Sequence, residues 1–289
     1  MTLAISWVRS VGNTKELVVM TDSRLRFGCN WDCGPKLLML PRSDAAICFA
    51  GETLFAYPLM LQLNSIVSTH TKTRSRAMDM HDFKGHAIRV FDRLRSLISD
   101  PPKGCEVPLP DGTLVLAGYS WKKKDFVIWI IRFDSRQKKF LFDTVTKSPS
   151  KQRKIAIVGD YVSEFKDQLS QLLISKGKRP NGVLDMEPLE VLRDMIRSGN
   201  YEKLGGAPQL AKIYQHMNCT PYAVYWPNRT SGEITLLGRP LLDYEVVEQM
   251  IIDPDSLEVV DSRKSVGDVA FEQSVRITRR GKIRKRKGA

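Results

Sequence analysis

The stretch Met1-Thr-Leu-Ala-Ile-Ser-Trp-Val-Arg9 predicts a β-strand at the beginning of the chain. Val11-Gly12-Asn13-Thr14 carries the residues of a turn, and Glu16-Leu-Val-Val-Met-Thr-Asp22 predicts a second strand that pairs back on the first. Because a hairpin returns the chain to its starting point, we expect Asp22 to lie near the first residues.

The next thirty or so residues continue with short strands. Asp22-Ser23-Arg24 closes the second strand, and Cys33-Gly34-Pro35 precedes a predicted strand from Lys36 to Leu40. Ala45-Ala-Ile-Cys-Phe-Ala-Gly51 predicts a buried strand that ends in glycine, and a helix follows from about Glu52. The beginning of the chain is therefore a series of strands followed at once by a helix.

Thr2 has the chemistry of a nucleophile that carries its own base. Removal of Met1 would make Thr2 the first residue, and its free α-amine could then take the proton of its own hydroxyl group. A structural explanation stays open, because threonine is common at the second position and β-branched residues suit a first strand. The surrounding pattern has to decide between them.

The remainder of the chain alternates between helical and strand patterns. Phe83, Ala87, Val90, Phe91 and Leu94 recur at helical spacing and are expected to face inward. We predict helices at about 52–71, 82–99, 161–175 and 187–198, and strands at 113–119, 126–133, 139–146, 154–158, 222–226 and 233–237. This order predicts two sheets with helices outside, an α+β fold of the four-layer αββα sandwich type.

The order of these elements resembles the β-type subunits of the proteasome and the related bacterial ATP-dependent proteasome-like peptidases, which are N-terminal-nucleophile hydrolases. The resemblance is strong from Thr2 to Tyr57 and weaker to about Gly238. It implies the same αββα fold, known as the N-terminal-nucleophile hydrolase fold. It also implies a threonine peptidase.

Four residues carry this resemblance into a site. Thr2 matches the threonine nucleophile, Asp22 the aspartate of a D-S-R-like strand end, Lys36 the lysine that begins a later strand, and Gly51 the glycine whose N–H helps to hold the oxyanion. An ammonium group near a hydroxyl favours its ionised form, and a carboxylate keeps that ammonium charged and oriented. Three of these positions also have a structural explanation: Asp22 as a turn former, Lys36 as a solvated strand end and Gly51 as a simple entry to a helix.

The residues that would support the threonine amine depart from the family pattern. The family usually has a Ser-Gly pair where this chain has Val158-Gly159-Asp160, and Ser163, one turn into the next helix, is a weak substitute. The second supporting aspartate and serine fall near Tyr201 or Glu202 and at Leu204. We therefore take Gly159, Asp160, Ser163 and Glu202 as candidate supporting residues, and the departure bears on whether the enzyme is active.

The length and composition predict one main domain with an extension. The 289 residues are 42% hydrophobic and 27% charged, enough to bury a sizeable core. We predict a domain at 1–242, an extension at 243–274 that packs on it, and a basic tail at 275–289. No apolar stretch is long enough to span a membrane and no secretory leader is visible. Five unpaired cysteines and scattered histidines predict a cytoplasmic protein with no metal and no cofactor.

The formal net charge of +13 is unevenly distributed along the chain. A terminal run of Lys and Arg is typical of a disordered segment that binds polyanions, including nucleic acid, although a solvated tail or an arm on a neighbouring subunit is the alternative. The basic residues of this run are Arg276, Arg279, Arg280, Lys282, Arg284, Lys285, Arg286 and Lys287.

The sequence thus supports three hypotheses about function. The first is a proteasome-like threonine peptidase that hydrolyses peptide bonds in peptide or protein substrates. By resemblance, it would assemble with itself into a ring of twelve or more subunits and work with an ATP-dependent unfoldase. The second is a catalytically inactive scaffold of the same architecture. The third is a polyanion-binding protein that acts through its basic tail.

Overall fold

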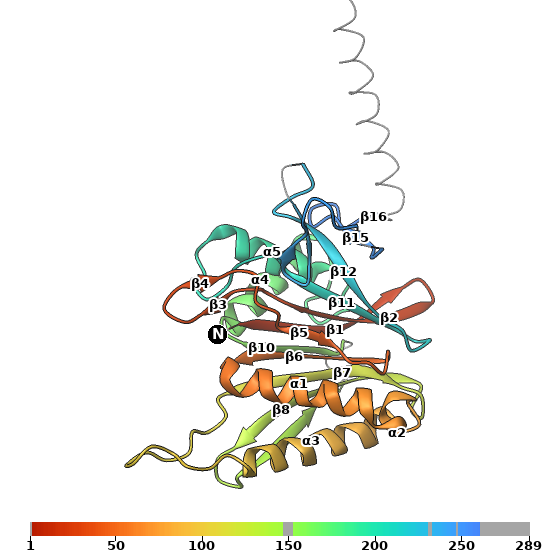
Figure 1. Cartoon of the computed structure of the whole chain (residues 1–289). Coiled ribbons are helices and arrows are strands. Elements are labelled where there is room, and N and C mark those ends of the chain that lie inside the picture. Colours follow the sequence, from red (N-terminus) through yellow and green to blue (C-terminus); the bar gives the residue numbers. More distant parts are fainter. Residues whose placement is uncertain (1, 147–152, 231–232, 247, 261–289) are drawn as a thin grey trace, which may run out of the picture.

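The computed structural model describes residues 2–146, 153–230, 233–246 and 248–260, and these residues form two larger β-sheets, a short two-stranded ribbon and five helices (Figure 1). The larger sheet has the order β10-β1-β2-β11-β12-β13-β14, and β15 joins it at β12 and continues to β16. Its strands are β1 (Leu3–Val11), β2 (Thr14–Thr21), β10 (Ile155–Gly159), β11 (Gln209–Tyr214), β12 (Cys219–Trp226), β13 (Glu233–Leu236), β14 (Arg239–Pro240), β15 (Ile251–Ile252) and β16 (Val259–Val260).

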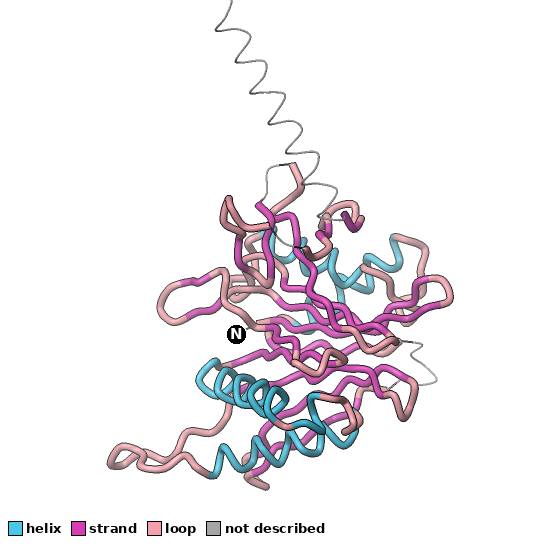
Figure 2. Tube along the Cα trace, turned by 45° about the vertical axis from the view of Figure 1, so that its right-hand side comes forward, coloured by secondary structure: helices cyan, strands magenta, loops and turns pink. Residues whose placement is uncertain are grey.

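The smaller main sheet has five antiparallel strands in the order β5-β6-β7-β8-β9. They are β5 (Leu37–Met39), β6 (Ala45–Gly51), β7 (Gly112–Ser120), β8 (Asp125–Asp134) and β9 (Lys139–Thr144). A separate ribbon pairs β3 (Leu25–Arg26) with β4 (Asn30–Trp31). The helices are α1 (Thr53–Thr69), α2 (Thr71–Arg74), α3 (Met80–Ser96), α4 (Val162–Ser175) and α5 (Glu187–Ser198). A second view shows the same arrangement of strands between helices (Figure 2).

The size of the side chains on each face of a strand explains how the sheets stack. In β1, Leu3, Ile5 and Trp7 point toward α4 and α5, whereas Ala4 and Val8 point toward the other sheet. Small residues such as Ala46 on β6 fill the layer between the sheets. Because both faces of these strands are covered, their buried residues are mostly apolar rather than alternately polar and apolar.

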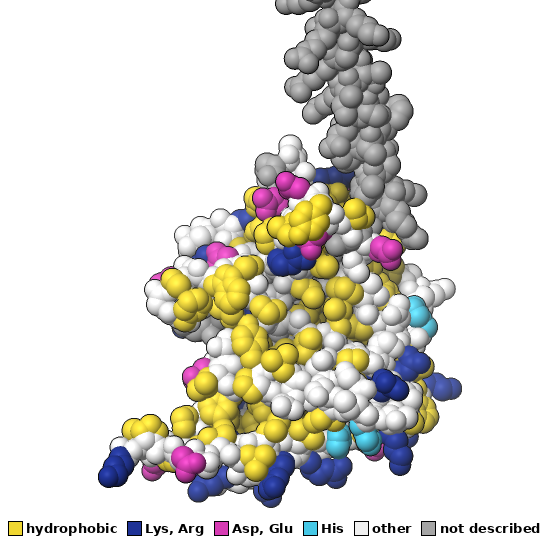
Figure 3. Space-filling model, in the orientation of Figure 1, with side chains coloured by type: hydrophobic (Ala, Val, Ile, Leu, Met, Phe, Trp, Pro, Cys, Tyr) yellow, Lys and Arg dark blue, Asp and Glu magenta, His cyan; other side chains and the backbone are white. Residues whose placement is uncertain are grey.

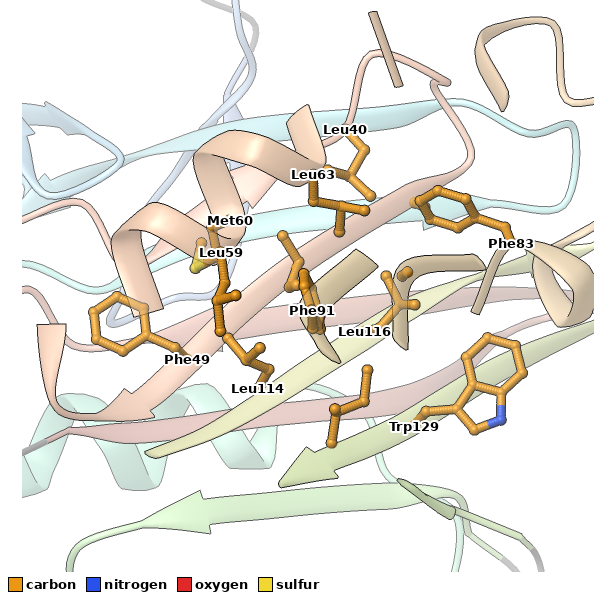
Figure 4. Packing of buried hydrophobic residues seen from close by; sticks show 14 of the residues in the cluster. Leu40, Phe49, Leu59, Met60, Leu63, Phe83, Phe91, Leu114, Leu116 and Trp129 are labelled. Carbon is orange, nitrogen blue, oxygen red and sulfur yellow. The ribbon is translucent and has the colours of Figure 1, made fainter. Parts of the chain in front are cut away.

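The outer face of the five-stranded sheet is covered by α1 and α3. Phe83 and Phe91 of α3 pack with Leu63 of α1 against Leu116 and Trp129 of the sheet, and all five side chains are buried (Figure 4). Asp79 precedes α3 as its N-cap, and its carboxylate accepts the main-chain N–H of His81 at 3.0 Å.

The predicted four-layer αββα sandwich is wrong for this chain. The described residues are mainly antiparallel β-sheet, with 34% of them in strands and 26% in helices. The sequence interpretation inferred the fold class from the order of the predicted strands and helices, whereas the larger sheet continues through short strands as far as β16. It also missed β11, which forms the centre of that sheet, because the polar residues Gln209 and Lys212 in this strand are typical of a loop when read alone.

Other sequence expectations differ from the structure at their edges. The predicted helix 52–71 is two helices, since His70 adopts an extended conformation between α1 and α2. Ile251 and Ile252 pair in parallel with β12 and are buried, so part of the predicted extension 243–274 contacts the main sheet. Residues 247 and 261–274 of that extension and the basic tail 275–289 lie outside the described residues, and the predicted domain boundaries stay predictions.

Adjacent residues of α4 provide a test of this packing. Leu173 is fully buried against the larger sheet, whereas Ile174 is 61% exposed. We expect Leu173→Ala to lower the free energy of unfolding by about 2–5 kcal/mol, because it leaves a cavity. Ile174→Ala, the control in the next position, is expected to change it by less than about 0.5 kcal/mol. Urea unfolding of both variants measures the difference, and equal losses would contradict the packing described for α4.

Candidate active site

The pairing of β1 with β2 brings Asp22 to the beginning of the chain. Ala4 pairs with Thr21, so the residue after β2 lies beside Leu3. The Asp22 carboxylate accepts the Leu3 N–H at 3.2 Å through Oδ1. Lys36, one residue before β5, places its Nζ 3.0 Å from both carboxylate oxygens, and Asp22 and Lys36 are both fully buried. The predicted neighbours Asp22 and Lys36 are thus brought together beside the main chain of Leu3, the residue that follows Thr2.

Two further main-chain donors complete the environment of the Asp22 carboxylate. Oδ2 accepts the N–H of Arg24 at 3.0 Å and that of Gly205 at 3.3 Å. Burial raises the pKa of Asp22, while Lys36 and the N–H groups of Arg24 and Leu3 oppose that rise. Burial lowers the pKa of Lys36, while the Asp22 charge and hydrogen bond oppose that fall. A buried ammonium held in this way releases a proton more easily than a lysine in water.

Gln209 fixes the position of Lys36 and was missed by the sequence interpretation. Its Oε1 accepts the N–H groups of Lys36 and Leu37 at 3.0 and 3.1 Å, and its Nε2 donates to the Gly34 carbonyl at 2.7 Å. A second Nε2 bond reaches Ser23 Oγ at 3.1 Å. Gln209 has no exposed surface in the structure. Because burial is not visible in the sequence, the sequence gives no signal for this role.

Thr2 is held at both of its main-chain polar groups by Asp160. The Thr2 nitrogen donates to Asp160 Oδ2 at 2.9 Å, and the Thr2 carbonyl accepts the Asp160 N–H at 2.8 Å. Gly159 makes this approach feasible, because a Cβ at that position would collide with the Thr2 carbonyl. With Met1 still part of the chain, Thr2 is fully buried.

Lys203 is a second residue that the sequence interpretation missed. Its Nζ lies 2.8 Å from Asp160 Oδ1, so Asp160 bridges a lysine and the Thr2 nitrogen. Burial acts to raise the pKa of Asp160, but the Lys203 hydrogen bond and the Thr2 N–H together hold it below its ordinary value of 3.8. The carboxylate beside the Thr2 nitrogen is therefore ionised at neutral pH.

Two candidate supporting residues lie elsewhere. Ser163 is exposed on the first turn of α4. Glu202 has a side chain 72% exposed and forms an ion pair of 2.7 Å with Arg26. Asp160 is thus the candidate supporting residue that contacts the main-chain nitrogen of Thr2.

Gly51 lies at the end of β6, on the same side of the molecule as Thr2. A Cβ added at Gly159 would approach both the Thr2 carbonyl and Ala50 Cβ, which places the end of β6 beside Thr2. Gly51 pairs with Gly112 and has a φ of +121°, and an added Cβ would approach the Gly112 Cα at 2.6 Å. The position therefore requires glycine.

A cavity of about 360 Å³ opens beside Gly51, lined by Leu25, Arg26, Gly51, Glu52, Thr53 and Asp111. A second cavity of similar volume lies between α1 and α3 and has an almost wholly apolar wall that includes Leu54, Pro58 and Ile98. The second cavity contains none of the predicted catalytic residues. We therefore place the candidate substrate site at the first.

Two kinds of feature are absent from the residues that the structure describes. No group of three or more His, Cys, Asp or Glu residues in the described ranges is placed to hold a metal ion. Among the helices of the same ranges, none is both long enough and apolar enough to cross a membrane.

Comparison with known proteins gives no further assignment. No protein-family model matches this chain, and a search of curated proteins finds no significant match. The function is consequently inferred from the geometry of Thr2, Asp22, Lys36, Asp160 and Gly51.

The buried ion pair predicts a large effect on stability. Lys36→Met leaves Asp22 as a buried, uncompensated carboxylate, and we expect the free energy of unfolding to fall by about 3–5 kcal/mol. The double variant Asp22→Asn with Lys36→Met removes both charges and is expected to recover part of that loss. Chemical denaturation of the two proteins measures the difference, and a double variant less stable than Lys36→Met alone would contradict the proposed charge compensation.

The ion pair between Asp160 and Lys203 predicts that the stability lost on replacing Lys203 depends on pH. Because the folded pKa of Asp160 lies below its ordinary value, its stabilising contribution is present above about pH 4 and is lost as the pH falls through the folded pKa. Lys203→Gln is therefore expected to destabilise the protein at neutral pH and to have a smaller effect below about pH 4. Lys166→Gln, on the exposed side of α4, is the control. Unfolding measured from about pH 3 to pH 7 tests this, and a Lys203 effect that is constant across the range would argue against the assignment.

Proposed function

We propose that this chain is an N-terminal threonine hydrolase that cleaves peptide bonds after Met1 is removed. One observation carries the proposal: the main-chain nitrogen of Thr2 is held by the Asp160 carboxylate, while the amide of the next residue shares Asp22 with Lys36. After removal of Met1, that nitrogen becomes an α-amine. A base, a cation and an orienting carboxylate would then surround one hydroxyl residue.

The first step is attack by the Thr2 hydroxyl on a substrate carbonyl. The C–O bond forms as the hydroxyl proton passes to the α-amine of Thr2. The amine then donates this proton to the nitrogen of the leaving peptide, and the C–N bond breaks. Water, deprotonated by the same amine, hydrolyses the resulting ester and releases the second product.

Lys36 and Gly51 have separate parts in this sequence. The Lys36 ammonium favours the ionised form of the hydroxyl group, and Asp22 orients the ammonium through contacts of 3.0 Å. The N–H of Gly51 is proposed to donate to the oxyanion that forms during attack, at a position where the backbone can approach a substrate closely. The cavity beside Gly51 would receive a substrate side chain.

Asp160 affects the pKa of the proposed amine differently from a serine, because its carboxylate is charged. An ionised carboxylate stabilises the protonated amine and raises its pKa, so the neutral amine becomes a stronger base. Lys203 on the opposite oxygen limits this effect. We therefore expect activity to increase with pH as the amine loses its proton.

The environment of the enzyme belongs to the same proposal. By resemblance, we expect a ring of identical subunits in the cytoplasm that encloses the sites, with an ATP-dependent unfoldase to deliver protein substrates. These expectations concern the assembly, and the chemistry at Thr2 does not depend on them.

Replacement of Thr2 tests the proposed nucleophile. Thr2→Ala removes the hydroxyl group and is expected to abolish both peptide hydrolysis and covalent labelling by a threonine-directed electrophile. Thr2→Ser keeps a hydroxyl group and should retain measurable labelling. Ser163→Ala is the matched control, because this hydroxyl is exposed on α4 and is expected to leave activity unchanged.

Intact mass spectrometry belongs in the same experiment, because the amine is free only in a chain without Met1. Active protein is expected to have the mass of residues 2–289 and to carry the label on Thr2. Labelling that is equal in Thr2→Ala and in the unaltered protein would refute the site assignment. A mature protein that keeps Met1 would favour the inactive scaffold instead.

A further inference from the structure

The charge of the described residues is concentrated on one side of the molecule. Residues 70–96 contain seven Lys and Arg against three Asp, and residues 121–144 again contain seven against three. The remaining described residues contain 19 Lys and Arg against 23 Asp and Glu. The folded body is thus basic over two segments and acidic elsewhere, independently of the basic tail.

The two segments form one continuous surface, which we call the basic face. α3 lies against β7 and β9, and the Phe140 N–H donates to Asp92 Oδ1 at 2.8 Å. Trp121 Nε1 donates to the Arg76 carbonyl at 3.0 Å. Figure 3 shows Lys and Arg side chains along the lower edge of the molecule, where α3 lies. Residues 70–96 and 121–144 are therefore neighbours in space.

Few of these positive charges are neutralised by the protein. Asp82 and Asp143 form ion pairs with Lys122 and Arg132 on the same face. By contrast, several exposed cations of these two segments have no ion pair among the described residues, and they include Arg89, Arg93, Lys123 and Lys124. Neighbouring exposed cations repel each other, and this favours the binding of an anionic partner.

The spacing and the aromatic content of this face fit a single strand of nucleic acid. Arg89 and Arg93 are one helical turn apart, about 6 Å along α3, which is close to the axial spacing of alternate phosphates in a strand. Trp121 is 41% exposed, and Lys122 Nζ lies 5.7 Å from its ring centroid. Cations that track phosphates beside an exposed aromatic ring are the elements of sequence-independent binding to single strands.

We propose that the basic face binds single-stranded nucleic acid without sequence preference. The cations of α3 and of the β7–β8 turn contact phosphates, and the indole ring of Trp121 stacks on a base. This surface is separate from the Thr2 site, and the inference does not rest on the proposed hydrolase.

The experiment separates the basic face from the tail by using a full-length chain in which the eight basic residues from Arg276 to Lys287 are replaced by Gln. The probe is a fluorescent RNA of mixed sequence, longer than the roughly 4–16 nucleotides that one binding fold covers. We expect this tail-neutral chain to bind the RNA, with affinity that falls as salt rises from about 50 to 200 mM.

In the tail-neutral chain we then replace three cations of the basic face together: Arg89→Gln, Arg93→Gln and Lys123→Gln. We expect this triple variant to bind the RNA about tenfold or more weakly. The slope of log affinity against log salt should fall by about 0.7 per lost phosphate contact. The matched control, Lys15→Gln, Lys103→Gln, Lys166→Gln, removes the same charge from exposed positions elsewhere and should remain within about twofold. Trp121→Ala is expected to weaken binding about fivefold or more.

Three results would overturn the proposal. The first is a tail-neutral chain that does not bind the RNA. The second is an equal loss of affinity in the variant of the basic face and in its control, which would mean that net charge alone is measured. The third is binding to duplex DNA as tight as binding to the single strand. Circular dichroism of every variant verifies that the fold is intact.

Discussion

The buried ion pair between Asp22 and Lys36 is the interaction on which the arrangement at the start of the chain depends. Each charge is completely removed from water, and each is stabilised chiefly by the other. The same carboxylate holds the amides of Leu3, Arg24 and Gly205, so three separate segments converge on two oxygen atoms. Since a buried charge without its partner is costly, the pair fixes these segments relative to each other as well as orienting the lysine. Structure and proposed chemistry thus share one set of contacts.

Asp160, the residue after β10, contacts the main-chain nitrogen and carbonyl of Thr2 because of its place in the sheet. β10 pairs antiparallel with β1, and Leu3 lies opposite Gly159, so the residue after β10 faces the main chain of Thr2. A longer side chain at position 159 would block this contact. The glycine and the aspartate therefore act together: one allows close approach, and the other uses it to hold the nitrogen. Lys203 balances the charge that this arrangement introduces.

The sequence predicted the local elements better than their assembly. Strand and helix periodicities located most elements, and the hairpin argument placed Asp22 beside the first residues, because these signals depend on neighbours in the chain. The overall class was wrong, since the extent of the larger sheet depends on β11 and on short late strands whose pairing is not encoded locally. Gln209 and Lys203 were missed for the same reason: their importance comes from burial and from partners distant in sequence.

The distribution of charge connects the site with the rest of the surface. At the site, cations and carboxylates are paired, and the Asp22–Lys36 pair is fully buried, so these charges act over short distances on specific atoms. On the basic face, exposed cations lack such partners among the described residues, and water and salt screen them. The first arrangement suits chemistry on one bond, and the second suits weak contact with a long polyanion. Because the five-stranded sheet lies between α3 and the larger sheet that carries Thr2, the two surfaces can act on different ligands.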